Sequence, residues 1–539
     1  MKKILSISLL AAIILATPGM VFLPISIAFT ATEGEYTYEI INGEAIITKC
    51  NWAHDEIEVP YILGGYPVTG IGDAAFRGRH NLTTILIPSS VTNIGNSAFY
   101  QCSNLSSVTI GNSVVSIGDS AFYQCSRLAS LNIPDSVLNI MNSVFFGCNS
   151  LTSITFGSGL KNIGNDILNC ENLIDIEVSS NNMSYSSQNG VLFNKNRTTL
   201  IIFPRGKGGS YSIPNSVTDI KDNAFKGCNK LNNINIVNGV TNIGDDAFRG
   251  CSGLISIAIP GSVISVANTA FSGCDSLTNI EVSNENLNYF SIDGVLFNKN
   301  NTVLIIFPAG KSGSYTIPST VTDVGYLAFE RCFGITSITI PDSVTNIGDG
   351  TFGGCMSLTS IIIPNSVTSI GFFAFVGCTS LNFILIPDSV TSIGEWSFFG
   401  CDKLTIYCFY DSCANEYASI NNIPFFILSN ETVNGEISKK GYTYDSVYVT
   451  VDYKFVLQNC YAFIAIYDGN KLVGLSSTFV PKGSEYSNLE ANCNLKNKAY
   501  TIKIIFMENQ NNIMPLSMPL VTSISVVTGY YYTSPSPTN

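Results

Sequence analysis

The sequence predicts a solenoid of repeated 23-residue coils followed by a small β-sandwich. Two observations predict the solenoid: 539 residues are too many for one compact core, and one 23-residue motif recurs twelve times. A third predicts the sandwich, because segments that run apolar or alternate in polarity at strand lengths replace the motif beyond residue 429. The chain is therefore expected to hold one linear core and a separate terminal domain.

Composition argues against two broad classes of protein. Charged residues make up only 12% of the chain and hydrophobic residues 45%, which is too apolar for a disordered protein. The formal charge is −12 and no cluster of five or more basic residues occurs, so the sequence argues against nucleic acid as a partner.

The N-terminal segment has the pattern of an export signal. Two lysines after the initiating methionine precede an almost uninterrupted apolar run over residues 4–29, and Ser26-Ile27-Ala28 offers the small residues that a signal peptidase recognises. The alternative is an uncleaved membrane anchor, which the two prolines and the glycine of this run disfavour. We expect residues 1–28 to be a cleaved signal peptide, leaving a secreted or cell-surface protein with no membrane span.

The repeat has the template VTxIGxxAFxxCxxLxxIxIPxS, which is clearest from Val91 onward. Its LxxIxIP part predicts a short strand, in which residues such as Ile361 and Ile363 face inward. Its AFxxCxxL part spaces apolar residues three or four apart and predicts a helical or 3₁₀ turn. One coil cannot bury both faces alone, so the coils must stack on one another. The twelve copies begin at Val68, Val91, Val114, Val137, Leu160, Val217, Val240, Val263, Val321, Val344, Val367 and Val390.

This template resembles the BspA-like class of leucine-rich repeats, and the resemblance covers roughly residues 33–429. Two longer units, 179–216 and 283–320, share a segment that recurs 104 residues on and predicts hairpins inserted between coils, as the family also has. The resemblance implies a leucine-rich repeat solenoid in a secreted or surface protein that serves adhesion or ligand binding. It implies no catalytic residues.

The ends of the array need covers, because an open coil would expose its apolar face. At the front, residues 33–67 predict a cap with a hairpin turn at Asn42-Gly43. The solenoid proper is expected over 68–407, with a cap at 408–429 whose helix starts from Ser412 as N-cap. Beyond it, 430–528 form the β-sandwich-like domain and 529–539 a loose tail.

Eleven of the sixteen cysteines occupy one position of the repeat. A line of thiols along the solenoid cannot converge as a tetrahedral zinc site. A disulfide ladder between coils remains an alternative, but the thiols all point the same way and their number is odd, which favours buried apolar fillers. Cys408 with Cys413 and Cys460 with Cys493 are the plausible disulfides, and Cys50 has no obvious partner.

No constellation of catalytic, metal-binding or cofactor-binding residues stands out from the repeat. The two histidines, His54 and His80, belong to no metal-binding motif, and a thiol such as Cys102 is expected to be buried without activation. We therefore expect no enzyme activity, no metal and no cofactor.

Binding is the better hypothesis, because the outward strand positions are small and polar in most coils, such as Ser107 and Thr109, and change in the late coils. The late coils place large apolar residues at outward strand positions and aromatic residues two positions after the Ile-Gly pair. The alternative is that this edge packs against the terminal domain. The candidate binding residues are Ile362, Phe373, Phe383, Leu385 and Trp396.

The expected function is adhesion or ligand binding outside the cell without catalysis. The expected partners are extracellular or host proteins, with glycans as a further class. The alternative function is a structural surface-layer component that associates with itself.

Overall fold

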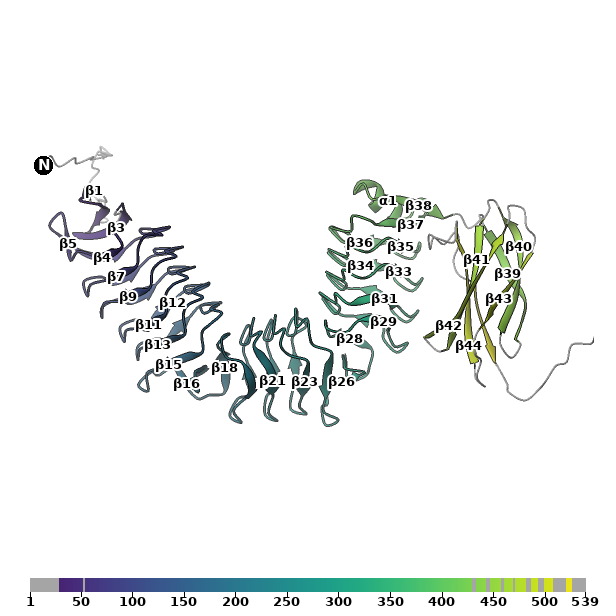
Figure 1. Ribbon diagram of the computed structural model, residues 1–539, viewed down its shortest axis with the longest axis horizontal. Helices are drawn as coiled ribbons and strands as arrows, with labels where there is room; N and C mark the ends of the chain where they lie inside the picture. Colours follow the sequence, from purple (N-terminus) through teal and green to yellow (C-terminus); the bar gives the residue numbers. More distant parts are fainter. Residues whose placement is uncertain are drawn as a thin grey trace, which may run out of the picture. The chain divides into compact units, whose positions relative to one another are not determined.

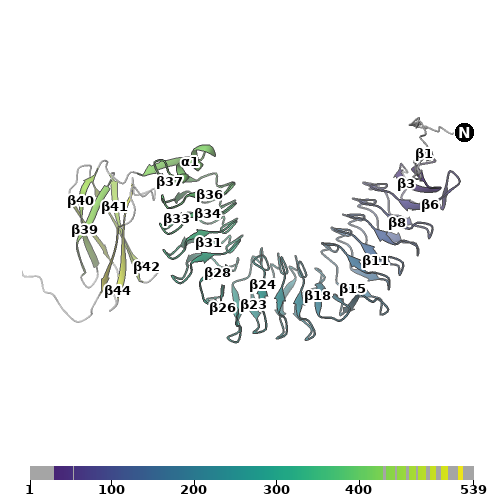
Figure 2. The ribbon, with the colours of Figure 1, turned by 180° about the vertical axis from the view of Figure 1, so that it is seen from behind.

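The computed structural model describes residues 29–51 and 54–428, and beyond them the strands between 433 and 525; side chains are described as far as Phe425. The chain divides into two compact units, Met1–Lys299 with Pro308–Gly310, and Asn300–Phe307 with Lys311–Asn539. Both units contain coils of the repeat, coloured from purple to green in Figure 1 and seen from behind in Figure 2. The expected signal peptide 1–28 and tail 529–539 lie outside the described residues.

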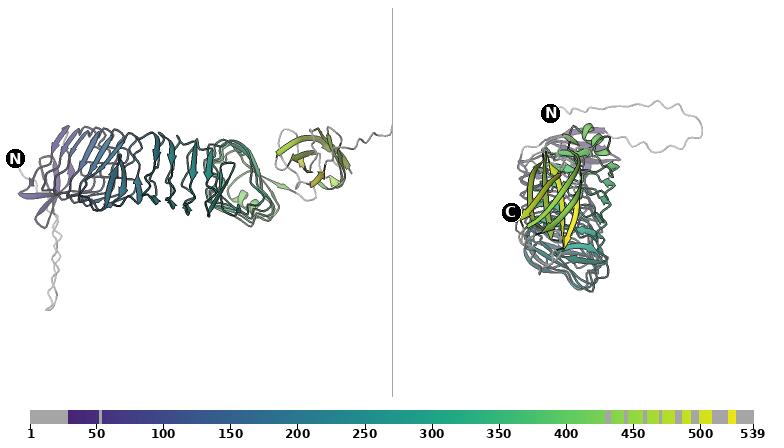
Figure 3. Two further views of the ribbon diagram at one scale, coloured as in Figure 1. Left: turned by 90° about the horizontal axis from the view of Figure 1, so that it is seen from below. Right: turned by 90° about the vertical axis from the view of Figure 1, so that its right-hand side faces the viewer.

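Each regular coil contributes a strand to two parallel sheets. The LxxIxI segment forms the first strand, and the two residues before the glycine, such as Ser116 and Ile117, form the second. Successive coils pair in register at an offset of one period, as Ser130 with Ser153 shows. Each position of the repeat therefore stacks on its counterparts, and we call such a row a column. The late coils are seen end on as closed loops in Figure 3, and the predicted solenoid is confirmed.

The first unit begins with β1 (Phe29–Glu33), β2 (Tyr36–Ile41), β3 (Glu44–Cys50), β4 (Glu56–Glu58), β5 (Ile62–Leu63) and β6 (Tyr66–Ile71). The first strands of its early coils are β7 (Thr84–Leu86), β9 (Ser107–Thr109), β11 (Ser130–Ile133), β13 (Ser153–Phe156) and β15 (Asp175–Val178). The second strands are β8 (Asn93–Ile94), β10 (Ser116–Ile117), β12 (Asn139–Ile140) and β14 (Asn162–Ile163). The first insert forms β16 (Tyr185–Gln188), β17 (Val191–Asn194), β18 (Thr199–Ile202) and β19 (Gly209–Ser212). The unit continues with β20 (Asp219–Ile220), β21 (Leu231–Asn235), β22 (Asn242–Ile243), β23 (Ser256–Ile259), β24 (Ser265–Val266), β25 (Asn279–Val282), β26 (Tyr289–Ile292) and β27 (Val295–Asn298).

The second unit has one sheet of second strands in the order β28-β30-β32-β34-β36 and one of first strands in the order β29-β31-β33-β35-β37-β38. The second strands are β28 (Val303–Ile306), β30 (Asp323–Val324), β32 (Asn346–Ile347), β34 (Ser369–Ile370) and β36 (Ser392–Ile393). The first strands are β29 (Gly313–Thr316), β31 (Ile335–Thr339), β33 (Ser360–Ile362), β35 (Phe383–Leu385), β37 (Thr405–Phe409) and β38 (Phe425–Leu428), with α1 (Cys413–Ile420) before β38.

The turn segment of each coil is not helical, so this part of the sequence prediction is wrong. Ala74, Phe76 and Gly78 donate their N–H groups to carbonyls of the next coil, while the residues between them donate to carbonyls three residues back. In most coils this alternation places two residues in the left-handed region, such as Ala74 (φ 56°) with Gly78 (φ 70°), or Ser97 (φ 54°) with Gln101 (φ 58°). A helix would use all of these N–H groups within one coil and would leave the next coil unbonded.

A ladder of phenylalanine rings fills the core beside the turn segment. The four rings from Phe76 to Phe145 are fully buried, and neighbouring ring centroids lie 5.0–5.8 Å apart. The same spacing recurs from Phe203 to Phe271, at 4.8–5.4 Å, and in the second unit from Phe307 to Phe398, at 4.7–5.2 Å. Each aromatic pair adds about 0.5–1.5 kcal/mol to what burial alone contributes.

The eleven cysteines of the repeat are buried thiols, which confirms the prediction of core filling. They also donate hydrogen bonds: the Sγ of Cys102 lies 3.1 Å from the carbonyl oxygen of Phe76 in the preceding coil, and that of Cys251 lies 3.0 Å from Phe225. Burial raises the pKa of Cys102 to about 12. The column is therefore a row of thiol donors. It comprises Cys102, Cys125, Cys148, Cys170, Cys228, Cys251, Cys274, Cys332, Cys355, Cys378 and Cys401.

Each end of the array has its own terminal structure. β2 and β3 form an antiparallel hairpin whose turn residues Asn42 and Gly43 have φ of 55° and 83°, and β1 adds a third strand. At the other end, the side chain of Ser412 accepts a hydrogen bond from the N–H of Asn415 at the start of α1. The prediction of Ser412 as N-cap is confirmed.

The predicted disulfide between Cys408 and Cys413 is wrong, because both residues are thiols. The cause is local: the Cys408 thiol interacts with the Ser412 hydroxyl, whereas the Cys413 thiol interacts with the backbone of Ile393. The other predicted bridge includes Cys493, which lies outside the described residues.

Beyond Leu428, the described residues form seven strands in two antiparallel sheets, ordered β39-β40-β43 and β42-β41-β44-β45. Their side chains are outside the described part of the chain, so the β-sandwich stays a prediction. No helix among the described residues is long and apolar enough to cross a membrane. The strands are β39 (Val433–Tyr442), β40 (Ser446–Val456), β41 (Cys460–Asp468), β42 (Lys471–Val480), β43 (Tyr486–Asn492), β44 (Ala499–Met507) and β45 (Leu520–Ser525).

The thiol column predicts a loss of stability at alkaline pH. Burial raises the pKa of Cys102 and Cys228 from 9.0 to about 12, so the folded state disfavours their thiolates. The stabilisation is complete below the unfolded pKa and is lost as the pH rises from about 9 toward 12, by about 1.4 kcal/mol per pH unit for each titrating thiol. Urea unfolding between pH 8 and 10.5 measures this loss. A Cys228→Ala, Cys251→Ala variant should show a shallower dependence on pH, and an unchanged dependence would contradict the assignment.

Candidate functional site

The structure separates the five candidate binding residues into exposed and buried positions. Ile362, Phe373 and Trp396 are exposed, with 39%, 47% and 53% of their surface accessible. Phe383 and Leu385 are buried, at 8% and 1%, so the prediction that they offer an exposed surface is wrong. Ile362 lies on β33, whereas Phe373 and Trp396 lie in turn segments, so the three exposed residues occupy two different columns.

Phe383 and Leu385 are buried because their neighbours on the outward face of the sheet are also large and apolar. Leu385 pairs in register with Tyr407, and the Phe383 ring meets that of Tyr407 edge-on at 5.8 Å. Together with Phe409 they form a buried apolar cluster of their own. If the neighbouring coils had polar outward residues, Phe383 and Leu385 would be exposed to water. Because the outward residues of the next coil are also apolar, the side chains cover one another.

Three aromatic residues form what we call the late aromatic cluster: Phe373, Trp396 and Phe399. Phe373 and Trp396 occupy the same column on neighbouring coils, and the N–H of Phe373 donates to the carbonyl of Glu395 at 3.2 Å. The rings of Trp396 and Phe399 meet edge-on at 5.2 Å. Phe399 is 61% exposed and was missed by sequence reasoning, although a ring directly after the ladder phenylalanine was a usable signal.

The late aromatic cluster carries backbone strain. Phe373 and Trp396 have φ of 54° and 59°, the left-handed region that bulky residues disfavour by about 1–2 kcal/mol. Leu327 (φ 56°) is the other large apolar residue of this column, and Gly350 also lies in it. In all but one of the other coils the column holds small or polar residues at positive φ, namely Ala74, Ser97, Ser120, Ser143, Asp166, Asn223 and Asp246. The fold itself therefore does not require aromatic side chains here.

An open groove of about 620 Å³ crosses the early coils, and we call it the early groove. Residues on either side of the cysteine column line it: Gln101 and Gln124 precede the cysteines, and Ser103 and Ser126 follow them. The Nε2 of Gln101 donates to the Oε1 of Gln124 at 2.8 Å, which joins neighbouring coils along one side of the groove. Sequence reasoning missed this site because each of these residues alone is an ordinary polar surface residue.

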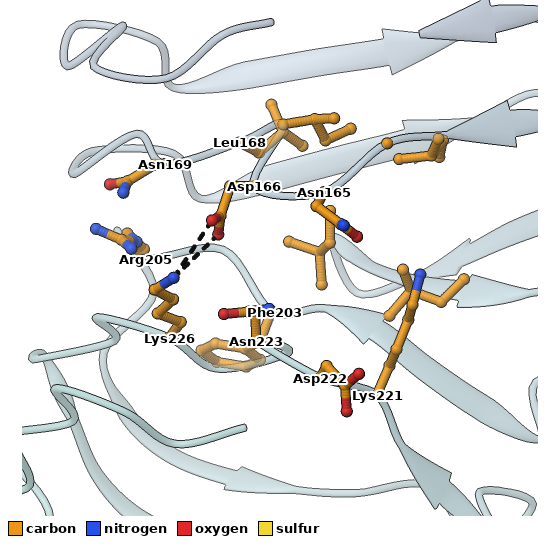
Figure 4. Close-up of a pocket in the computed structure, with 15 residues that line it drawn as sticks. Asn165, Asp166, Leu168, Asn169, Phe203, Arg205, Lys221, Asp222, Asn223 and Lys226 are labelled. Atoms are coloured by element: carbon orange, nitrogen blue, oxygen red, sulfur yellow. Dashed lines mark hydrogen bonds and ion pairs between the residues drawn. The ribbon is translucent and has the colours of Figure 1, made fainter. Parts of the chain in front are cut away.

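A smaller cavity of about 50 Å³ lies where the first insert joins the coils (Figure 4). The coil that starts at Leu160 has Leu168 in place of the ladder phenylalanine and one residue fewer before Cys170, which leaves this space. The Nζ of Lys226 lies 3.3 Å from a carboxylate oxygen of Asp166 (Figure 4). Such a partly exposed pair contributes at most about 1 kcal/mol to holding the flanking coils together.

Arg205, from the first insert, lies beside this cavity and also lines the early groove. Burial lowers the pKa of its guanidinium group. Its space exists because residue 227 is glycine: a Cβ there would lie 2.6 Å from the Cζ of Arg205. At the second insert, the corresponding residues are Ala309 and Arg331, so the small and large side chains exchange places.

A family model agrees with this column structure. The model of the BspA type leucine rich repeat region matches residues 69–196, 203–313 and 307–423, which is more than half of the chain. The chain belongs to the BspA-type leucine-rich repeat family. No curated protein matches it.

Solved structures similar to this BspA-type chain come from bacteria. A leucine rich cell surface protein of Faecalibacterium prausnitzii is 28% identical over 72% of this chain and 97% of its own, with a TM-score of 0.41. A leucine-rich repeat protein of Eubacterium ventriosum is 26% identical over 66% of this chain and 95% of its own, with a TM-score of 0.47. One of Bacteroides ovatus is 26% identical over 76% of this chain and 100% of its own, with a TM-score of 0.39.

Replacing the strained aromatic residues of this BspA-type array should stabilise it. Asparagine tolerates the left-handed region, so Phe373→Asn and Trp396→Asn should each raise the free energy of unfolding by about 1 kcal/mol in urea titrations. Met356→Asn is the control, because Met356 is 47% exposed but lies outside the left-handed residues, and it should give no gain. A loss of stability in both aromatic variants would show that their packing outweighs the strain.

Proposed function

We propose that this BspA-type protein is exported to the cell surface, has no catalytic role and binds an extracellular or host protein through the late aromatic cluster. The observation that carries the proposal is the placement of Phe373 and Trp396 at strained backbone positions while about half of each side chain stays exposed. Strain of this kind persists where a function uses it.

The chemistry of the cluster favours a protein as the partner. Exposed tryptophan and phenylalanine side chains bury large apolar areas on binding, and tryptophan is enriched among the residues that dominate protein interfaces. The rigid coil beneath them is bonded to its neighbours through backbone groups, since Phe375 donates to the carbonyl of Ser397 at 2.8 Å. The backbone that carries the rings is therefore held in place before binding, which lowers the entropy that association costs.

Self-association is the second candidate function, because an exposed apolar cluster can also contact another copy of the same chain. Sedimentation velocity of the purified protein over a range of concentrations distinguishes the two. Concentration-dependent assembly that Trp396→Asn abolishes, without binding to any added protein, would support this candidate and contradict the first.

The proposal predicts a loss of binding without a loss of fold. Surface plasmon resonance against fibronectin, fibrinogen, laminin and collagen should detect a partner for the intact chain. The double variant Phe373→Asn, Trp396→Asn should weaken that binding at least about 100-fold, because two central aromatic anchors are removed. Leu327→Asn is the matched control: it removes a bulky residue from the same left-handed column outside the cluster and should bind as the parent does. Equal weakening by the control would argue against the cluster.

A further inference from the structure

We propose that the early groove is a second binding site, which takes a neutral glycan chain. It lies in the first unit, on coils that contribute nothing to the late aromatic cluster. The proposal goes beyond protein binding and depends on four features of the groove: its length, its aromatic lining residue, its polar groups and its charge.

The groove extends along the array across several coils. Its lining residues come from the coils of Gln101, Gln124 and Phe146, from the shortened coil of Asn169, and from the first insert through Arg205. A site that repeats at the spacing of stacked coils suits an extended chain ligand rather than a single small molecule. Its volume, about 620 Å³, is within the range of sites that bind small ligands.

A stack of rings ends in the groove. Tyr100 and Tyr123 are stacked with centroids 4.8 Å apart, and Tyr123 and Phe146 are stacked at 4.9 Å and 4°. The guanidinium carbon of Arg77 covers the first ring, 4.7 Å from the Tyr100 centroid. After Phe146, the next coil has Asn169 where a further ring would follow, so Phe146 is the last ring of this stack in the described part of the chain. Phe146 lines the groove, and an aromatic face suits the apolar C–H face of a sugar ring.

The stack is not a requirement of the repeat. The two coils before the shortened coil carry Tyr123 and Phe146 in this column, whereas the corresponding coils before the second insert carry Lys226 and Arg249. A ring returns in this column only at Phe399 of the last coil, so the run of three stacked rings is confined to the early coils. Gln101 and Gln124 are likewise confined to them, because their column is mostly glycine in the later coils.

The polar groups of the groove match a ligand rich in hydroxyl groups. Amide side chains from Gln124, Asn149 and Asn169 each carry donors and acceptors, and Ser103 and Ser126 add hydroxyls. A sugar hydroxyl is likewise both donor and acceptor. The bond between Gln101 and Gln124 orients both amides and leaves each with further donor and acceptor positions.

The charge of the groove favours a neutral chain over an anionic one. Arg205 and Glu171 are its two lining residues with permanent charges, and these charges are opposite. Among the lining residues, a polyanion would meet one permanent cation beside a carboxylate, and the formal charge of −12 on the chain opposes its approach. The neutral glycan is therefore the ligand class that the groove fits.

Affinity gel electrophoresis of the full chain tests the proposal, with xyloglucan, galactomannan and yeast mannan as neutral probes and heparin and polygalacturonate as anionic ones. At least one neutral polysaccharide should retard the protein, and calorimetry with that probe should show Phe146→Ala weakening binding at least about tenfold. Phe146→Tyr keeps the ring and should bind within about twofold of the parent. Gln124→Ala provides an independent test on an exposed side chain that does not touch the core, in case Phe146→Ala destabilises the coil.

Phe399→Ala is the matched control, because Phe146 and Phe399 occupy the same Phe-Phe-Gly-Cys motif, at 145–148 and 398–401. It should leave polysaccharide binding unchanged and weaken binding of the protein partner, while Phe146→Ala does the reverse. Retardation by heparin or polygalacturonate alone, retardation by none of the probes, or unchanged binding in both Phe146→Ala and Gln124→Ala would each overturn the glycan site without touching the proposed protein binding. Loss of protein binding in Phe146→Ala would place both ligands in one site and overturn the proposal that the early groove is a second site, separate from the late aromatic cluster.

Discussion

Backbone hydrogen bonds between neighbouring coils are the interaction on which this molecule depends. In the turn segment, alternate N–H groups point to the next coil, and the left-handed residues, two in most coils, make this direction possible. This pattern is incompatible with a helix. It gives the backbone N–H groups of the segment hydrogen-bond partners that they would otherwise lack. Each coil then holds its neighbour at a fixed spacing, and every side-chain column follows from that spacing.

The core columns are consequences of this register. Ladder phenylalanines stack because their Cα atoms are held one coil apart, and the thiols reach the phenylalanine carbonyl of the preceding coil for the same reason. Cysteine suits the position because it is small, apolar and still a weak donor. The outward columns carry no such requirement. Their side chains can change from Ser and Thr to Phe and Trp without altering the core, so one scaffold can present different surfaces on different coils.

The core-facing positions could be predicted from the sequence, because twelve copies of the repeat show which positions are consistently apolar. Residues such as Ile361 and Ile363 are buried as expected. The turn conformation could not, since helical spacing of apolar residues does not report the sign of φ at Ala74 or Gln101. Exposure of outward residues also escaped prediction. Whether Phe383 is exposed depends on Tyr407, a residue one coil away, and a single-column pattern does not contain that information. The early groove was missed for the same reason, because it exists only when residues of several columns are assembled.

The two Phe-Phe-Gly-Cys motifs show how neighbours decide what one short sequence does. Phe146 lies flat against Tyr123 of the preceding coil and is half-buried. Phe399 has Val376 in that preceding position, and its ring instead meets Trp396 of its own coil edge-on, leaving it largely exposed. A flat ring face beside amides suits the regular, hydroxyl-rich surface of a sugar, whereas a raised group of ring edges suits a pocket between apolar side chains. The same four residues therefore differ in exposure and ring contacts, because the array supplies each copy with a different adjacent coil.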